Sequence, residues 1–227
     1  MDFFVIYGLT IISLIITLVA QGFVSGSYRR YKKISNSRGM NGCNAAKEIL
    51  YKSGLSDVRV EEVSGVLADH YDPRDKTVRL STDVYHGTSI ASVSVAAHEV
   101  GHALQHAKGY AFIELRNKML PATQIASQFG WLSVFIGLFL AFDLLFWFGV
   151  VALVVVLLFQ VVTLPIEFNA SSRAIEQLTS NGIIEMSEVP SARKMLNAAA
   201  FTYVAALIST LTQILRILVI RNGRNRK

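Results

Sequence analysis

Long uncharged stretches dominate the pattern of hydrophobic and polar positions along the chain. No charged residue occurs in residues 3–24, 119–142 or 144–166. Each run reaches or exceeds the ~20 residues that a helix needs to cross the hydrocarbon core of a bilayer. A fourth uncharged run, residues 195–215, carries several hydroxyl and amide side chains and is a weaker candidate. The pattern predicts an α-helical membrane protein.

The second and third runs are separated by a single acid. Asp143 is the only charged residue between Lys118 and Glu167. An acid inside a membrane span suggests a functional site, but here the chain on each side is long enough to span without it. We therefore predict a transmembrane hairpin over residues 119–166 with its turn near Asp143. The two ends of such a hairpin lie on the same side of the membrane.

The polar region, residues 25–118, has the mixed pattern of an α+β domain. Residues 44–52 are typical of a short amphipathic helix, and residues 58–63 and 77–80 have the β-branched character of strands. These strands are expected to pair across a loop that contains an Asp-Pro turn signal. A further helix is predicted at about residues 89–108, and another polar helix at residues 167–194. Pro165, directly before that segment, suits a helix start.

Composition and charge place this region relative to the membrane. Hydrophobic residues make up 52% of the chain and the formal net charge is +6. Basic residues lie close to the predicted spans, namely Arg29, Arg30, Lys32, Lys33, Arg116 and Lys118. The positive-inside rule explains this placement without a nucleic-acid partner. We therefore expect a multi-pass protein of the cell membrane, anchored from residues 3–24 and with its polar region in the cytoplasm.

The last apolar segment leaves two alternatives open. Three spans return the chain to the cytoplasm after residue 166. A fourth span over residues 195–220 would place the basic tail, residues 221–227, outside, against the charge rule. The segment is expected to be membrane-embedded, either as a fourth span or as an interfacial helix.

The sequence HEVGH supplies the clearest chemical signal. His98 and His102 lie one helical turn apart, so both imidazoles can reach one metal ion, and Glu99 lies between them. Catalytic zinc usually takes three protein ligands and leaves a fourth position for water. A hairpin returns Glu167 to the side of the two histidines, which makes it the predicted third ligand. His106, a further turn along, is expected to be a surface or supporting residue.

Several motifs together resemble the YugP-type family of membrane-bound neutral zinc metallopeptidases. They are DHYDP (69–73), VRLS (78–81), VAAHEVGHALQHAKGY (95–110) and EFNASSRA (167–174). The layout is also similar to HtpX-type membrane zinc peptidases. The resemblance implies a zincin-like cytoplasmic domain with one Zn²⁺ held by His98, His102 and Glu167. It departs from the HtpX-like pattern at Ser171, where that pattern has an acid that can orient a metal-binding histidine.

The predicted activity is hydrolysis of peptide bonds in membrane-associated or juxtamembrane polypeptides. Zinc activates a water molecule, and Glu99 acts as general base and then as general acid. His70, Tyr71 and Arg173 are candidate donors to the tetrahedral oxyanion. Residues 77–80 are a candidate edge strand for an extended substrate.

Two other function classes compete with this interpretation. A non-catalytic, zinc-stabilised membrane scaffold would have no need of Glu99. A metal transporter would call for ionisable residues within the spans, and the first three spans have none.

Overall fold

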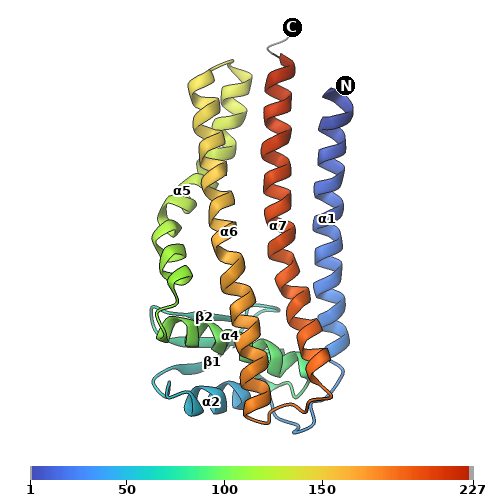
Figure 1. Ribbon diagram of the computed structural model, residues 1–227, viewed down its shortest axis with the longest axis vertical. Helices are drawn as coiled ribbons and strands as arrows, with labels where there is room; N and C mark the ends of the chain where they lie inside the picture. The colour runs from blue at the N-terminus through green and yellow to red at the C-terminus, as the bar shows by residue number, and fades with distance from the viewer. Residues whose placement is uncertain (1, 225–227) are drawn as a thin grey trace. The chain divides into compact units, whose positions relative to one another are not determined.

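The computed structural model describes residues 2–224. The elements are α1 (Asp2–Tyr31), α2 (Gly42–Lys52), β1 (Arg59–Val63), β2 (His70–Asp72), β3 (Thr77–Ser81), α3 (Thr82–His86), α4 (Ile90–Ala107), α5 (Ala111–Phe139), α6 (Asp143–Ser180) and α7 (Val189–Arg224). They form two compact units. The polar unit comprises residues 22–113 and 165–201, and the helical unit comprises the rest of α1, α5, α6 and α7. Figure 1 labels most of these elements.

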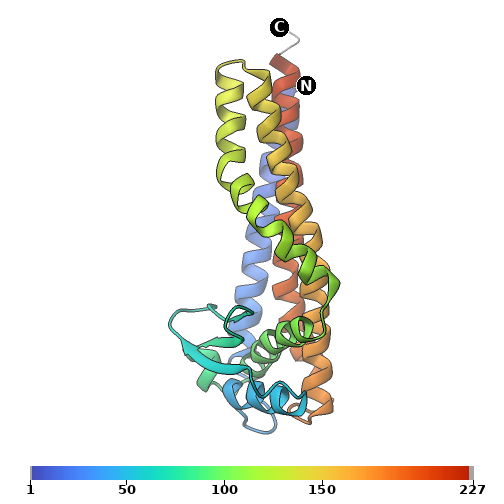
Figure 2. The same ribbon diagram turned by 90° about the vertical axis from the view of Figure 1, so that its left-hand side faces the viewer.

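A three-stranded sheet and two helices form the framework of the polar unit. The strand order is β1-β3-β2, with β1 parallel and β2 antiparallel to β3. Helix α4 packs against β2 and β3, and α2 packs against β1 and α4. The sheet and these two helices can be followed in Figure 2. The predicted α+β character of this region is confirmed.

One expectation about the sheet is wrong. Residues 77–80 belong to the central strand β3, so they cannot be the edge strand that was predicted. The loop between the two predicted strands contains β2, a strand of only His70–Asp72. Three residues beside an Asp-Pro turn signal are too few to show strand alternation, so the sequence pattern concealed this strand.

Apolar side chains from the sheet and the helices close the core of the polar unit. Val78 and Leu80 of β3, Ile49 of α2 and Val100 of α4 are fully buried in one cluster. Helix α4 buries a run of small residues, including Ala96, Ala97 and Ala103. Small side chains allow neighbouring elements to approach α4 closely, and this helix carries HEVGH.

The helical unit contains the predicted hairpin. Helices α5 and α6 pack through glycine: a Cβ atom at Gly149 would lie 2.7 Å from the Gly130 carbonyl oxygen, and one at Gly137 would meet the Phe146 backbone. Small residues at such positions let membrane helices pack tightly. Asp143 is the first residue of α6, directly after the turn, as predicted.

Helix α7 continues through the last apolar run and ends beside the hairpin turn. The Arg221 guanidinium lies 4.6 Å from the Phe146 ring centroid and 4.9 Å from that of Trp147. Its Nη2 atom is 2.8 Å from Asp143 Oδ1. Four helices in the described chain are long and apolar enough to cross a membrane, including α7.

Helix α6 corrects the expected helix start at Pro165. The helix continues from Asp143 through Pro165 to Ser180, so Glu167 lies in its interior. Proline lacks an N–H and removes one bond to the carbonyl of residue 161. A long helix supported on both sides of that position tolerates the loss. The single polar helix predicted over residues 167–194 is wrong, because α6 ends at Ser180, just before Gly182 with its positive φ of 62°, and α7 begins at Val189.

Candidate metal centre

Two imidazoles project from one face of α4. The Ser89 hydroxyl caps this helix by accepting a hydrogen bond from the Ser92 backbone N–H, at 3.1 Å. His98 and His102 follow at the spacing of one turn, and their ring centroids are 4.8 Å apart. Both rings are largely shielded from solvent, with side chains 14% and 15% exposed. Their Nε2 atoms point toward α6.

A carboxylate from α6 meets both rings. Glu167 Oε2 lies 3.3 Å from His98 Nε2 and 3.8 Å from His102 Nε2. The possible ligand atoms of the three residues all lie within 4.8 Å of one another. Among residues 2–224, this is the one group of three or more such side chains arranged to hold a metal ion. The residues that HEVGH and the hairpin predicted are therefore brought together.

Gly101, inside HEVGH, makes this meeting possible. A Cβ atom at this position would lie 2.7 Å from the Ala170 carbonyl oxygen and 3.2 Å from its Cα atom. A Cβ atom is essentially never found closer than 3.0 Å to such an atom, and backbone cannot easily move aside, so a side chain here would push α4 and α6 apart. The glycine thus brings the two histidines within reach of the α6 carboxylate.

Gln105 fixes the orientation of the His102 ring. Its side chain is fully buried, and its Nε2 donates hydrogen bonds to the Ile166 carbonyl, at 2.8 Å, and to Asn169 Oδ1, at 3.0 Å. A carbonyl oxygen can only accept, so the amide nitrogen must face it. Gln105 Oε1 therefore faces His102 Nδ1, 3.0 Å away, and accepts its proton. This tautomer leaves the lone pair of His102 on Nε2, beside Glu167.

Ser171 occupies the equivalent place for His98. Its hydroxyl oxygen lies 3.2 Å from His98 Nδ1. A proton on Nδ1 donated to this oxygen places the lone pair of the His98 ring on Nε2, the atom that faces Glu167. Both supporting groups, Ser171 and Gln105, are uncharged.

Arg173 lies in the same network. Its Nε donates to Asn169 Oδ1 at 2.7 Å, and the same oxygen accepts from Gln105. Sequence reasoning had named Arg173 but not Gln105 or Asn169. Gln105 did leave a signal, because it follows His102 by three residues, a spacing that makes the two side chains neighbours on a helix.

Glu99 is buried next to the three converging side chains. It is only 8% exposed, and burial raises its pKa to about 7. The charges of Glu167 and Asp69 add to this rise, whereas His98 and a hydrogen bond from the Tyr71 backbone oppose it. A carboxyl group with this pKa exchanges protons near neutral pH.

The remaining candidates lie around β2. The Tyr71 hydroxyl is 3.0 Å from His106 Nδ1, so His106 supports this tyrosine and is not part of the ligand group. The His70 side chain is exposed and bonds the Ala68 carbonyl through Nδ1. Asp69 accepts hydrogen bonds from the backbone and hydroxyl of Ser81.

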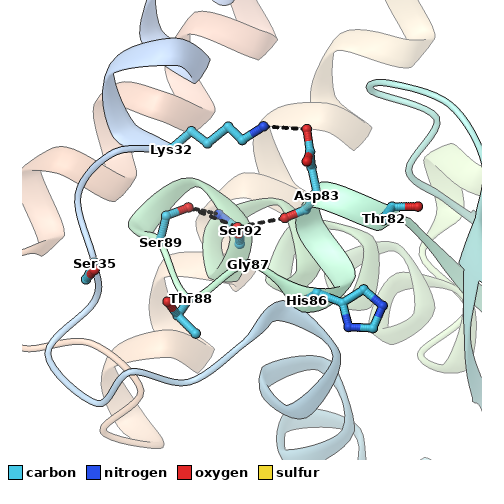
Figure 3. A pocket seen from close by; sticks show the side chains of 9 residues that line it. All are labelled: Lys32, Ser35, Thr82, Asp83, His86, Gly87, Thr88, Ser89 and Ser92. Carbon is cyan, nitrogen blue, oxygen red and sulfur yellow. Dashed lines mark hydrogen bonds and ion pairs between the residues drawn. The ribbon is translucent and has the colours of Figure 1, made fainter.

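A hollow elsewhere in the polar unit has several of its polar groups paired with one another. It has a volume of about 350 Å³ and lies between the end of α1, α3 and the start of α4. Figure 3 shows the Lys32 ammonium on Asp83, and Ser92 between Ser89 and the Asp83 carbonyl. These pairings join the segments and leave no grouping of ligand atoms like that of the metal centre.

Comparison with known proteins agrees with this geometry. The family model described as "putative neutral zinc metallopeptidase" matches residues 6–222. The chain belongs to this family. The "Putative membrane protease YugP" of Bacillus subtilis (strain 168) is 44% identical over 218 residues, which cover 96% of this chain and 97% of that protein. No solved structure matches. The resemblance drawn from the sequence motifs is confirmed.

Proposed function

We propose that the protein is a membrane-embedded zinc metalloendopeptidase that cleaves membrane-associated or juxtamembrane polypeptides. One observation carries the proposal: His98, His102 and Glu167 converge, and the carboxyl group of Glu99 is buried beside them. Membership of the neutral zinc metallopeptidase family supports it.

The donor set suits zinc. Two imidazole nitrogens and one carboxylate oxygen are a common catalytic ligand set for this ion, and three protein ligands leave one position open. With their Nδ1 atoms next to Gln105 and Ser171, both histidines direct Nε2 toward Glu167. When bound, zinc would acidify a water molecule and polarise the carbonyl group of the substrate.

Glu99 would carry the proton in this reaction. As a carboxylate it accepts the proton of the attacking water, and as a carboxylic acid it donates that proton to the leaving amine. Burial of Glu99 favours its neutral form. Near neutral pH its carboxylate and its carboxylic acid are therefore closer in free energy than those of an exposed glutamate.

The edge strand β2 would hold the substrate. It ends the sheet, packs against α4 and carries Tyr71, whose backbone contacts Glu99. An extended peptide can add to such an edge through main-chain hydrogen bonds. Among the candidate oxyanion donors, Tyr71 is the best supported, because a proton on His106 Nδ1 can be donated to the Tyr71 oxygen and would leave the Tyr71 O–H to donate to the substrate. His70 is exposed, and the Nε of Arg173 is engaged by Asn169.

Membrane topology follows from charge and from α7. Basic residues after the first span favour a cytoplasmic polar unit. The contact of Arg221 with Asp143 favours α7 as a fourth span that ends on the side of the hairpin turn. This topology places the basic tail outside, against the charge rule. The positive charge of Arg221 is then partly balanced by the Asp143 carboxylate and by contacts with the rings of Phe146 and Trp147.

The alternative is a zinc-stabilised scaffold without catalytic activity. Glu99 separates the two, because a structural site does not need a buried acid next to its ligands. The test compares proteolysis by the wild type, Glu99→Gln and the exposed control Glu176→Gln at matched zinc content. Loss of turnover by about 10² to 10⁴-fold in Glu99→Gln alone supports the peptidase. Equal turnover in all three proteins removes Glu99 from the mechanism.

A further inference from the structure

A polar cleft lies within the helical unit, between α1, α6 and α7. Its volume is about 360 Å³, near the lower end of the range for ligand sites. Its polar lining comprises Thr17, Gln21, Gln160, Thr202, Ser209 and Thr210. Gln21 on one helix and Ala206 on another are exposed, so the cleft opens sideways.

Hydrogen bonds between α1 and α7 continue beyond the cleft. Ser13 and Ser209 are joined by a hydrogen bond of 2.6 Å between their hydroxyls, and Arg216 Nη1 donates to Thr10 Oγ1 at 3.0 Å. Such pairs hold membrane helices together. If the polar residues between α1 and α7 served only to hold the two helices together, the helices would pack closely along the whole row of these residues. Instead they leave an open space next to Gln160.

Gln160 gives the cleft an unmet chemical requirement. Its Oε1 atom is buried and accepts no hydrogen bond in the part of the chain that the structure describes. It sits in the uncharged run of residues 144–166, where the surrounding lipid offers no donor. An acceptor in this setting needs a partner that brings an N–H or O–H group.

We propose that this cleft binds a short unwound stretch of a membrane-spanning polypeptide. A helix that unwinds within a bilayer exposes backbone N–H and C=O groups, which are tolerated only where protein or water receives them. The hydroxyl and amide groups of the cleft supply such partners, and Gln160 Oε1 accepts a backbone N–H. Acyl chains have no donor and do not meet this requirement.

The choice of a polypeptide rests on the proposed function and identifies its substrate class. Helix α6 carries both Gln160 and, seven residues later, the predicted ligand Glu167, a separation of about two turns. A peptidase acts on extended chain, so a span must unwind before its bonds can be cleaved. The absence of charge from the cleft lining fits a neutral segment.

Photocrosslinking to synthetic spans tests the proposal. The full-length Glu99→Gln protein is reconstituted in phospholipid vesicles with biotinylated leucine–alanine peptides that carry a diazirine at mid-span. One peptide is uninterrupted, and the other has a central Asn-Gly pair that favours unwinding. Crosslinked residues are mapped by mass spectrometry in this protein, in the same protein with Gln160→Leu, and in one with Gln128→Leu as an exposed control on α5.

The expected crosslinks fall on the lining residues Gln21, Ala206 and Thr210, and the Asn-Gly peptide gives the higher yield. Gln160→Leu lowers that yield by about threefold or more, the scale of one hydrogen bond, whereas Gln128→Leu does not. Crosslinks spread evenly over lipid-facing residues, adducts to phospholipid alone, or an unchanged yield in Gln160→Leu would overturn the proposal. Because binding is read without catalysis, failure of the wild type to hydrolyse peptides would count against the peptidase and not against the cleft.

Discussion

Gln105 Oε1 lies 3.0 Å from His102 Nδ1 and sets the protonation of that ring. The same side chain reaches the Ile166 carbonyl through its amide nitrogen. It therefore ties the second histidine of HEVGH to the segment of α6 that carries Glu167. A metal centre assembled from two helices needs such a link, because its ligands are distant in sequence.

Gln105→Leu should weaken zinc binding. The substitution removes the acceptor for His102 Nδ1–H, so the ring loses its fixed tautomer and orientation. We expect a fall in zinc affinity of about 10 to 100-fold, as found when supporting partners of metal ligands are lost. Competition with a chromophoric chelator measures it. Gln177→Leu, a glutamine of the same polar unit outside the site, serves as the control and should keep wild-type affinity.

Ser171 offers a test in both directions. Ser171→Ala removes the hydroxyl next to His98 Nδ1 and should lower zinc affinity by about tenfold. Ser171→Asp places a carboxylate there, which raises the basicity of the imidazole and should restore or increase affinity. The neighbouring Ser172 is exposed, and Ser172→Ala should have no effect. Equal affinities for the Ala and Asp variants would contradict the assigned role.

The buried Glu99 should make the metal-free protein sensitive to pH. Its pKa is about 7 in the folded protein and ~4.3 in an unfolded chain. Between these values the folded state binds more protons, so its stability falls as the pH rises. Glu99→Gln removes this loss. In chelator-treated protein the variant should be more stable than the wild type by about 3 to 4 kcal/mol at pH 8.

The pH dependence distinguishes this effect from a general change in packing. The stability difference should shrink to about 1 kcal/mol at pH 5, because that pH is only slightly above the pKa of ~4.3 that Glu99 has in the unfolded chain. Thermal unfolding in detergent at the two pH values measures it, and Glu176→Gln should show no such dependence. A difference that is constant across the pH range would mean that Glu99 is not held neutral by burial.

The contact between Arg221 and Asp143 predicts the side on which α7 ends. Leu140→Cys, in the hairpin turn, and Gly223→Cys should both react with a membrane-impermeant maleimide on intact cells. Tyr51→Cys, at an exposed position of the polar unit, should react only after permeabilisation. The native Cys43 is buried and gives a low background. Reaction of positions 140 and 223 from opposite sides would show that α7 does not cross the bilayer.

Much of the arrangement could be predicted because it depends on local periodicity. The two apolar runs predicted the hairpin. The single charge between them, Asp143, predicted the position of the turn, and Asp143 is the first residue of α6. The one-turn spacing of His98 and His102 predicted that both side chains lie on the same face of one helix. Two crossings then returned Glu167 to them, because a hairpin leaves its ends on one side.

The parts that escaped prediction depend on tertiary contacts. Strand β2 is too short to show alternation, and its pairing with β3 depends on residues further along the chain. The role of Gln105 exists only because α6 crosses α4 at Gly101. Pro165 was expected to start a helix, but the surrounding helix α6 overrides that local preference.

The zinc content of Glu167→Ala tests the central claim most directly. Purified wild type, Glu167→Ala and the exposed control Glu176→Ala are dialysed against a low zinc concentration and assayed by plasma mass spectrometry. We predict about one zinc per chain in the wild type and in Glu176→Ala, and a large loss in Glu167→Ala, because two imidazoles alone hold the ion weakly. Stoichiometric zinc in Glu167→Ala would contradict the ligand set His98, His102 and Glu167.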